Sequence, residues 1–273
     1  MSDAAVWADC AKGYRYCHRE PTKEEKTYAQ NNKEHHDYHY TDVPIQQASY
    51  RAGTAGTMDA DVVHILREAI LTLKGQTPAE AVSDLDQKTA LWLLVHQVGD
   101  IHQPLHVGAI YFNKDCSARV DPNVVGAGKK NFGIGKTVRA TQGGNKLMLG
   151  EEAELHAFWD SGAVDRAITL SHENDATIPQ IGAYFAAHPI ANWQTTGAVD
   201  TWPMAWANET FVLAKGALGT NISYGDGEVD DAGECVVDVM VTPKYRTDAG
   251  EIAVKQLTRA GFRLAAVLEA IFP

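Results

Sequence analysis

The segment Ala90-Leu-Trp-Leu-Leu-Val-His-Gln-Val-Gly-Asp-Ile-His-Gln-Pro-Leu-His106 decides the fold of this chain. It is apolar on nearly every side, which predicts a helix buried in a core rather than one at the surface. Pro104 ends that helix, because proline cannot continue the backbone hydrogen bonding and shifts the preceding residue away from helical angles. We therefore expect His106 to project from the chain just after the turn.

The same segment carries one of two His-x-x-x-Asp pairs, His96 with Asp100, and the other is His156 with Asp160. A helix brings residues four apart onto one face, so each pair presents an imidazole beside a carboxylate, two ligand types that zinc accepts. An ionised Asp100 in apolar surroundings is costly unless a cation or hydrogen-bond donors compensate it. One pair alone is equally compatible with a core histidine bonded to a core aspartate. Two pairs with His106 between them suggest more than one metal.

Composition sets broad limits on function. The 273 residues are 45% hydrophobic and 22% charged, which is ordinary for a globular protein with a substantial core. The net charge of −11 argues against a basic face that grips nucleic acid, but not against a phosphate substrate, because bound zinc makes a site locally cationic. We find no apolar run long enough to span a bilayer and no signal peptide. Two disulfides would permit three pairings, of which Cys10–Cys17 closes most easily; the other cysteines are Cys116 and Cys235.

Most of the chain predicts helix. Apolar spacing predicts helices over 58–74, 151–168, 201–218 and 250–272, and the capping box Thr77-Pro-Ala-Glu80 starts another. Between residues 108 and 146 turn residues are frequent, with the β-prone piece Thr137-Val-Arg-Ala-Thr141, so we expect a long excursion with a hairpin. A second, acidic and turn-rich excursion covers 219–244. Neither looks like a linker, so we expect one mostly helical domain over residues 1–273.

Further ligand candidates lie near the start of the chain. They are Asp9 in Val6-Trp-Ala-Asp9, and His39 with Asp42 in His39-Tyr-Thr-Asp42. Lys12 follows Asp9 by three residues and shares its face if that segment is helical. Taken singly, these residues are unremarkable: an Asp/Lys pair at this spacing is usually a solvated surface pair, and the segment 34–39 is equally compatible with a polar loop. The type and placement of four other histidines argue against ligation, namely His35, His36, His64 and His102.

Together, these segments resemble the S1/P1 nuclease family of zinc-dependent enzymes. The matching pieces come in family order and run across nearly the whole chain: Trp7-Ala-Asp9 with Lys12, His39-Tyr-x-Asp42, His96-x-x-x-Asp100-x-x-Gln-Pro-Leu-His106, Gly143-Gly-Asn145, His156-x-x-Trp-Asp160, Trp206-Ala-x-Glu209 and Gly261-x-Arg-Leu264.

The resemblance implies an all-α fold: a single multi-helix domain of the phospholipase C/P1 nuclease type, with a small β-hairpin-like excursion between the metal-binding helices. It also implies three zinc ions in a cleft. One would be held by Asp9, His39, His96 and Asp100, and a second by His106, His156 and Asp160. Asp100 would bridge the first zinc to the third.

The implied activity is hydrolysis of single-stranded DNA or RNA to 5′-mononucleotides, with 3′-nucleotidase activity from the same site. The zinc ions would activate a water for in-line attack on phosphorus. Asp9, Lys12 and Asp100 would be catalytic, with Lys12 neutralising charge on the phosphoryl group. Tyr40, Asp42 and Asn145 would bind substrate, the first two by stacking on a base and accepting its hydrogens. The resemblance implies a secreted or periplasmic protein without a stable protein partner or a membrane span.

In one respect the match is incomplete. The family's mature chain starts with a tryptophan that binds the third zinc, and a histidine a few residues later binds it too. Here Met1 lies eight residues before Asp9, so we expect an N-terminally truncated domain, either from a start codon set too late or from a true truncation. Two other functions stay open: a phospholipase C-like phosphodiesterase on the same fold, and a non-catalytic zinc-binding domain.

Overall fold

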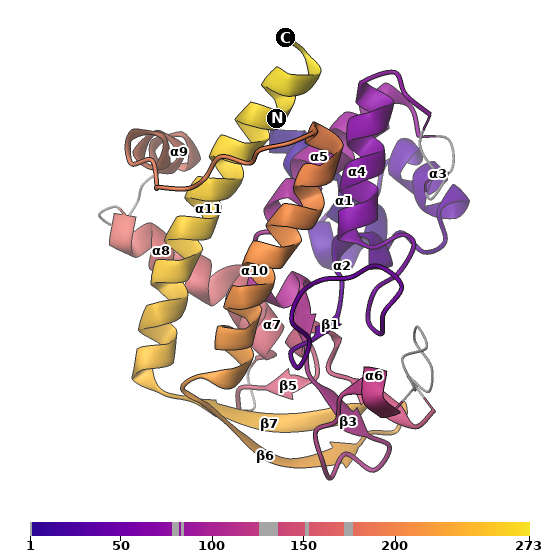
Figure 1. The fold of residues 1–273 in the computed structure, drawn as a ribbon, viewed down its shortest axis with the longest axis vertical. Helices are drawn as coiled ribbons and strands as arrows, with labels where there is room; N and C mark the ends of the chain where they lie inside the picture. Colours follow the sequence, from indigo (N-terminus) through magenta and orange to yellow (C-terminus); the bar gives the residue numbers. More distant parts are fainter. Residues whose placement is uncertain (1, 78–81, 83–84, 126–135, 151–152, 172–176) are drawn as a thin grey trace.

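The structure of the protein is a computed structural model that describes residues 2–77, 82, 85–125, 136–150, 153–171 and 177–273. In this part of the chain helices dominate and the sheets are small, as predicted (Figure 1). The helices are α1 Ser2–Lys12, α2 Tyr14–Cys17, α3 Lys23–Asn31, α4 Val62–Leu73, α5 Gln87–Asp100, α6 Pro122–Val125, α7 Leu155–Ala157, α8 Ala163–Ser171, α9 Ile178–Ala187, α10 Trp202–Gly219 and α11 Pro243–Ile271.

Short helical turns and short strands connect these helices. The turns are η1 Asp37–His39, η2 Pro104–His106, η3 Gln142–Gly144, the π-helical turn η4 Phe158–Gly162 and η5 Val199–Thr201. The strands are β1 Val43–Pro44, β2 Gly108–Ala109, β3 Tyr111–Asn113, β4 Val138–Ala140, β5 Leu147–Met148, β6 Ile222–Val229 and β7 Cys235–Val241. No helix of the described residues is long and apolar enough to cross a membrane.

The main core lies where α4, α5, α10 and α11 meet. Leu94, Val98 and Ile101 of the α5 segment are buried there together with Trp206 and Phe211 of α10. The prediction of a buried helix is therefore confirmed. It begins after Asp86, whose side chain accepts a hydrogen bond from the Thr89 amide, and it ends at Asp100, before Pro104.

An ion pair between the buried Arg263 and the exposed Glu209 links two helices of this core. Arg263 of α11 donates to Glu209 of α10 at 2.5 Å and to the backbone oxygen of Trp193 at 2.8 Å, and its Nη1 lies 3.0 Å from His102 Nε2. The structure thus brings together two motifs whose paired residues, Glu209 and Arg263, are 54 positions apart in the sequence: Trp206-Ala-x-Glu209 and Gly261-x-Arg-Leu264. Both fix the packing of α10 and α11 rather than line the cleft described below.

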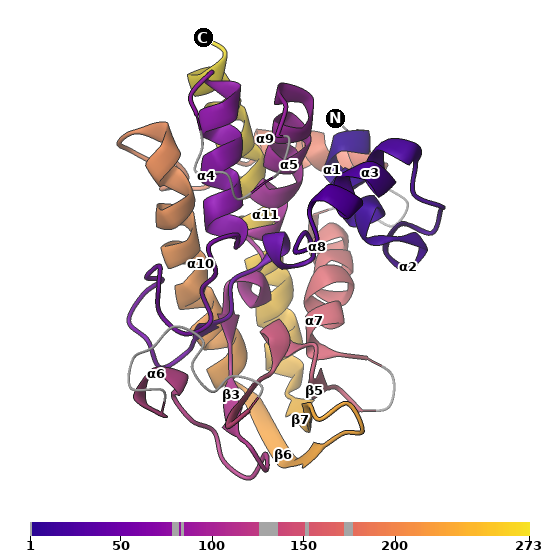
Figure 2. The same cartoon turned by 90° about the vertical axis from the view of Figure 1, so that its right-hand side faces the viewer.

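The first helix packs on the other side of α5. Trp7, Ala8 and Ala11 of α1 bury their side chains against Leu93 of α5 and Tyr28 of α3. The Cys10–Cys17 disulfide then ties α1 to α2, which is the pairing that closes most easily in the sequence. In Figure 2, the α1–α3 segment lies above α7 and α8 on one side of the molecule.

A second core lies below, where the small sheets pack against α11 and α8. β6 and β7 form an antiparallel hairpin, and β5 joins β7 in parallel. The Cys116–Cys235 disulfide fastens this sheet to the excursion that holds β3 and β4, which pair antiparallel but are separated by 24 residues, so they are not the tight hairpin expected from the sequence. We predicted turns but no strands for 219–244. Alternating burial in Cys235–Val241 explains the strand.

Three predicted helix boundaries are wrong. The helix predicted over 58–74 begins at Val62, because the Asp61 side chain accepts from the amides of Val63 and His64. The helix predicted over 250–272 begins at Pro243, after the capping residue Thr242. The helix predicted over 151–168 begins only at Leu155 and widens into the π-turn η4. The capping box at Thr77-Pro-Ala-Glu80 falls on residues 78–81, outside the described residues.

Candidate metal centre

Four predicted ligands come together around one point, and we call them the Asp9 cluster: Asp9 of α1, His39 of η1, and His96 and Asp100 of α5. His39 Nδ1 and His96 Nε2 lie 3.0 Å apart, and Asp100 Oδ2 lies 2.8 and 3.1 Å from them. Asp9 Oδ1 is 3.8 Å from both nitrogens. The predicted helical face is confirmed for the His96–Asp100 pair.

These distances are close to those between the ligands of one metal ion, although none equals the tetrahedral value. Ligand atoms about 2.0–2.2 Å from a tetrahedral zinc lie about 3.3–3.6 Å from one another, and the observed separations lie on both sides of that range. His96 also donates from Nδ1 to the backbone oxygen of Ala5 at 2.6 Å, which fixes the ring and leaves Nε2 facing the other ligands. The Asp9 cluster thus has the donor atoms and the orientation that a zinc site requires.

The remaining three predicted ligands form the Asp160 cluster: His106, His156 and Asp160. Asp160 Oδ1 lies 3.6 Å from His106 Nε2, and its Oδ2 lies 3.4 Å from His156 Nε2. Both imidazoles donate from Nδ1 to a backbone oxygen, His106 to His39 at 2.7 Å and His156 to Gly143 at 2.8 Å. Each Nε2 therefore faces Asp160 and is available to a metal.

Backbone contacts place the two clusters next to each other. The parallel pairing of β1 with β2 continues into the hydrogen bond from the Thr41 amide to the His106 oxygen, so the chain after His39 runs beside His106. The backbone of Gly143 passes close to Leu105 and holds the His156 ring through its oxygen. Its φ is +56°, and a Cβ there would lie 2.2 Å from the Leu105 oxygen, so only glycine fits.

The charges of the two clusters call for a cation. Burial opposes ionisation of Asp100, but His96 and His106 outweigh it and hold the pKa of this carboxyl well below its usual range. Burial also lowers the pKa of His106, yet the carboxylates of Asp100 and Asp160 outweigh it and raise that pKa to about 9. Burial lowers the pKa of His39 to about 3, which keeps its lone pair free. The acidic groups thus attract a positive charge even without a metal.

Both clusters open into one cleft of about 590 Å³. Five of the six predicted catalytic and substrate-binding residues line it: Asp9, Asp100, Tyr40, Asn145 and Lys12, whose Nζ lies 2.9 Å from Asp9 Oδ1. Asp42 does not line it. The side chain of Asp42 is buried, and burial raises its pKa to about 7, although the Gly143 amide favours the charged form.

Sequence reasoning missed several residues of the site. Gln103 donates from Nε2 to Asp160 Oδ1 at 2.8 Å, and its oxygen accepts from the Leu105 amide, so one side chain holds both η2 and a ligand. Gln103 could have been identified from its position within the motif Asp100-x-x-Gln-Pro-Leu-His106, between two of the predicted ligands. Arg15 and Tyr16 also line the cleft. Of the described histidines, His35, His36, His64 and His102 lie outside both clusters.

Comparison with known proteins agrees with this geometry. The sequence profile described as S1/P1 Nuclease matches residues 1–273. Endonuclease 2 of Arabidopsis thaliana is 24% identical over an alignment that covers 100% of this chain and 78% of that protein. Endonuclease 1 and Endonuclease 4 of the same plant are 23% and 22% identical, each over 86% of this chain and over 68% and 69% of their own lengths.

Proposed function

Because the chain belongs to the S1/P1 nuclease family, we propose that it is a zinc-dependent phosphodiesterase that hydrolyses single-stranded DNA and RNA to 5′-mononucleotides and removes 3′-phosphates from nucleotides. Family membership and the three endonuclease relatives support a nuclease hydrolase. One observation carries the finer proposal: seven residues with zinc-ligand chemistry form two neighbouring clusters, and all of them except the buried His96 line a single cleft.

Each cluster has a distinct part in this proposal. Zinc bound there would supply a nucleophilic water at neutral pH and stabilise the charge of the phosphoryl oxygens. Asp9, His39, His96 and Asp100 would hold one ion, and Asp100 would share a further ion on the cleft side. His106, His156 and Asp160 would hold another. We therefore expect at least two zinc ions per chain.

Lys12 would neutralise charge on the substrate. Its ammonium group lies 2.9 Å from Asp9 and faces the cleft, so a phosphate that contacts the Asp9 cluster comes within its reach. Such a positioned positive charge stabilises a transition state in which charge gathers on the phosphoryl oxygens. Asn145, whose Nδ2 donates to the Gln142 oxygen at 2.7 Å, would contact the substrate from the opposite wall.

Tyr40 would stack on a base. Its hydroxyl donates to Asp37 Oδ1 at 2.8 Å, which fixes the ring at the edge of the cleft. Stacking needs an unpaired base, and this favours single strands over duplexes. Asp42 is two residues away, and its Oδ1 is buried without a hydrogen-bond partner among the described residues. A base that donates a hydrogen bond there would satisfy this oxygen, provided that the side chain becomes accessible.

Hydrolysis assays on four substrates test the proposal. Single-stranded DNA, single-stranded RNA, a 3′-mononucleotide and phosphatidylcholine vesicles would each be incubated with the protein, with zinc and with chelator. We expect 5′-mononucleotides from both nucleic acids and inorganic phosphate from the 3′-nucleotide, all abolished by chelator. Cleavage of phosphatidylcholine alone would establish the phospholipase C-like function, and zinc binding without any turnover would establish a non-catalytic domain.

The two disulfides bear on localisation. Such bonds persist in oxidising surroundings and are rare in the cytosol. We propose that the protein is secreted or periplasmic. Fractionation of cells that express the natural gene, followed by immunodetection, tests this directly.

A further inference from the structure

The short helix α2 presents aromatic side chains to solvent beside the cleft. Tyr14 is 58% exposed and Tyr16 is 47% exposed, and none of the four residues of α2 is buried. Tyr16 and Arg15 line the cleft together with Lys12. Exposed tyrosines next to a binding cleft are the surface that unpaired bases use for stacking.

One side chain connects Tyr16 to the Asp9 cluster. Lys12 Nζ lies 2.9 Å from Asp9 Oδ1 and 5.2 Å from the centroid of the Tyr16 ring. The His36 ring meets Tyr16 edge-on, with 5.9 Å between centroids. A single-stranded nucleic acid with one phosphate at the Asp9 cluster would therefore place a neighbouring nucleotide close to the Tyr16 ring.

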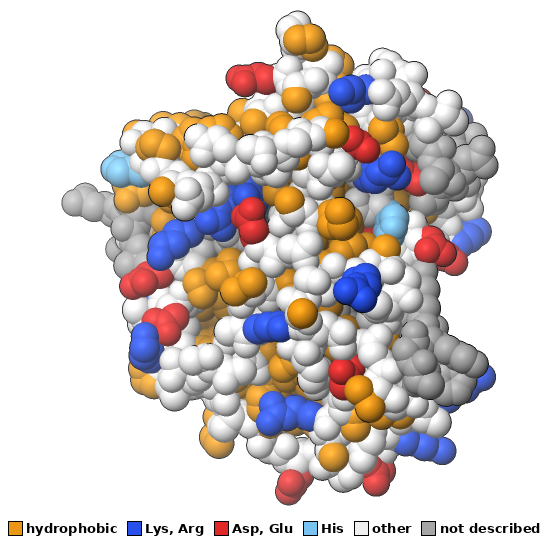
Figure 3. Space-filling model, in the orientation of Figure 1, with side chains coloured by type: hydrophobic (Ala, Val, Ile, Leu, Met, Phe, Trp, Pro, Cys, Tyr) orange, Lys and Arg blue, Asp and Glu red, His pale blue; other side chains and the backbone are white. Residues whose placement is uncertain are grey.

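Arg15 is available to an external anion. It makes no ion pair with any residue that the structure describes, whereas Arg19 is held by Glu25 at 2.6 Å and Lys146, across the cleft, by Glu234 at 3.1 Å. The protein carries a net charge of −11, and acidic and basic side chains are interspersed over the face in Figure 3. An unpaired guanidinium at the cleft is therefore a local attraction for phosphate.

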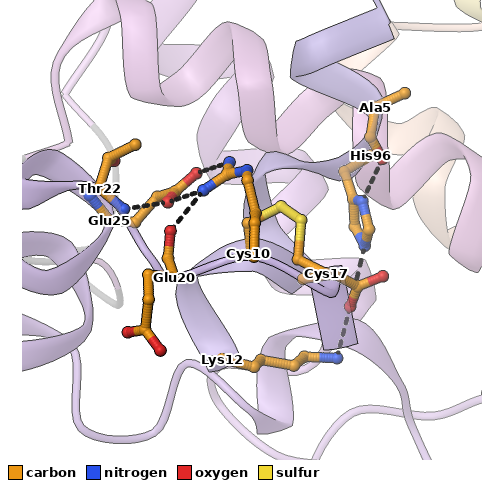
Figure 4. The surroundings of a disulfide bond; sticks show 10 residues. Ala5, Cys10, Lys12, Cys17, Glu20, Thr22, Glu25 and His96 are labelled. Carbon is orange, nitrogen blue, oxygen red and sulfur yellow. Dashed lines mark hydrogen bonds and ion pairs between the residues drawn. A yellow bond between two sulfur atoms is a disulfide. The ribbon is translucent and has the colours of Figure 1, made fainter. Parts of the chain in front are cut away.

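The surrounding contacts hold this surface in place. The Cys10–Cys17 disulfide closes the turn, and Gly13 enters it at a φ of +123° that side-chain-bearing residues rarely adopt. After the turn, Arg19 binds Glu25, and Thr22 and Glu25 form a reciprocal cap of α3. Figure 4 shows the disulfide between Thr22 and Glu25 on one side and His96 on the other, with Lys12 below it. A rigid platform loses little entropy when it binds a strand.

We propose that Tyr16 and Arg15 form a second nucleotide subsite, in which Tyr16 stacks on the base next to the nucleotide at the metal centre and Arg15 binds its phosphate. The ligand is a single-stranded nucleic acid of two or more nucleotides. The inference rests on the proposed function, because it assumes that the cleaved phosphate lies at the two clusters.

Two substrates of different length test this subsite. A ten-residue thymidine oligonucleotide reaches the subsite, whereas a 3′-mononucleotide occupies only the metal centre. For Tyr16→Ala, the ratio of kcat/KM for the oligonucleotide to that for the mononucleotide should fall about tenfold, and Tyr16→Phe should retain most of it because stacking needs only the ring. Arg15→Ala should lower the same ratio and reduce by about one the slope of log KM against log salt.

Binding is measured separately, by fluorescence anisotropy of a labelled phosphorothioate oligonucleotide on the zinc-loaded protein. Arg51→Ala and Phe272→Ala serve as controls, because they remove an exposed arginine and an exposed aromatic ring outside the cleft. Unchanged ratios and unchanged binding in Tyr16→Ala and Arg15→Ala would overturn the subsite. A wild type that binds the oligonucleotide but cleaves nothing would overturn the proposed function, and weaker binding by Tyr16→Ala would then still support the subsite.

Discussion

The Asp9 cluster and the Asp160 cluster use the same ligand types on very different supports. The Asp9 cluster rests mainly on regular helices: three of its four ligands lie on α1 and α5, its two imidazoles are 4% and 6% exposed, and α5 lies within the main core. The Asp160 cluster rests on a turn after Pro104, a glycine-rich turn and a π-turn, and the Asp160 side chain is 49% exposed. One is part of the core, and the other is assembled at its edge.

The two clusters therefore differ in what fixes the positions of their ligand atoms. In α5 the helix itself sets the distance between His96 and Asp100. In the Asp160 cluster single hydrogen bonds orient the ligand side chains: Gln103 donates to Asp160, and His156 donates to the Gly143 oxygen. The π-turn widens the helix between His156 and Asp160, and such turns are frequent at functional sites. We therefore expect the Asp160 cluster to exchange its metal more readily.

Chelation should have the largest effect. Removal of all zinc is expected to reduce hydrolysis of single-stranded DNA to background, because both clusters contribute to one cleft. Zinc content measured by mass spectrometry during dialysis against a chelator should fall in two stages, with the more exposed Asp160 cluster emptied first. A single-stage loss would break the comparison, and full activity in zinc-free protein would contradict the proposed function.

Substitution of Asp100 should come next. Asp100→Asn removes the charge that faces both imidazoles of its cluster, so kcat should fall by about 10³-fold or more. Asp160→Asn should reduce kcat less than Asp100→Asn does, because Asp160 is half-exposed and water can take the place of the lost ligand atom. Kinetics and zinc content of both variants measure the difference. His64→Ala is the control: it should retain wild-type zinc, since His64 binds Asp61 at 2.8 Å outside both clusters.

The lysine at the Asp9 cluster and a second lysine of the cleft should differ in their effect on catalysis. Lys12→Ala is expected to lower kcat about 10²-fold while the zinc content stays unchanged, because Lys12 contacts Asp9 but is not a ligand. Lys146→Ala removes another lysine of the cleft lining, one that Glu234 already neutralises. The fall in kcat should therefore be far smaller than in Lys12→Ala. Equal losses in the two variants would show that only the overall charge of the cleft matters.

Gln103 tests the support of the Asp160 cluster. Gln103→Ala should weaken zinc binding at this cluster about 10- to 100-fold, as is usual when the partner of a metal ligand is lost, and leave the Asp9 cluster filled. Competition with a fluorescent zinc chelator resolves the two affinities. Gln30→Ala, at an exposed position of α3, provides the matched control. A zinc affinity unaltered by Gln103→Ala would mean that the hydrogen bond does not orient Asp160.

The smallest effect concerns stability beside the Asp9 cluster. Bonding to Arg19 lowers the pKa of the Glu25 carboxyl below its ordinary value of 4.5. The ionised form therefore stabilises the fold above that pH, and this contribution is lost as the pH falls through the lower folded-state pKa. Glu25→Gln should reduce Tm at pH 7 by about 2–4 °C, and less at pH 3, by differential scanning fluorimetry. An equal reduction at both pH values would contradict the ionic contribution.

The fold could be predicted where periodicity is strong. The apolar pattern of 90–101 gave α5 correctly, because burial on every side leaves few alternatives. Helix starts were harder: Asp61 and Thr242 cap their helices, but the residues around each cap are also compatible with continued helix or loop. The hairpin of β6 and β7 was missed because the acidic turn between the strands dominated the local composition.

The proposed ligands of the candidate site could be identified from the sequence, but the residues that support them and part of the cleft lining could not. All seven proposed ligands could be found from His/Asp spacing and the family resemblance, and the structure places them in two clusters. Burial of Asp42 could not be foreseen, because it results from the pairing of β1 with β2 across 65 residues of sequence. Likewise, Arg15 and Tyr16 reach the cleft only because the Cys10–Cys17 disulfide folds α2 back on α1.

The Cys116–Cys235 disulfide has a consequence for the lifetime of the protein. It closes a loop of 119 residues that contains His156 and Asp160. A protease that nicks the backbone once anywhere inside this loop produces two pieces that remain joined by the disulfide. No fragment diffuses away, and His156 stays tethered to the helices that carry the other ligands. The damaged molecule therefore keeps all the proposed ligands within one covalently joined pair of fragments.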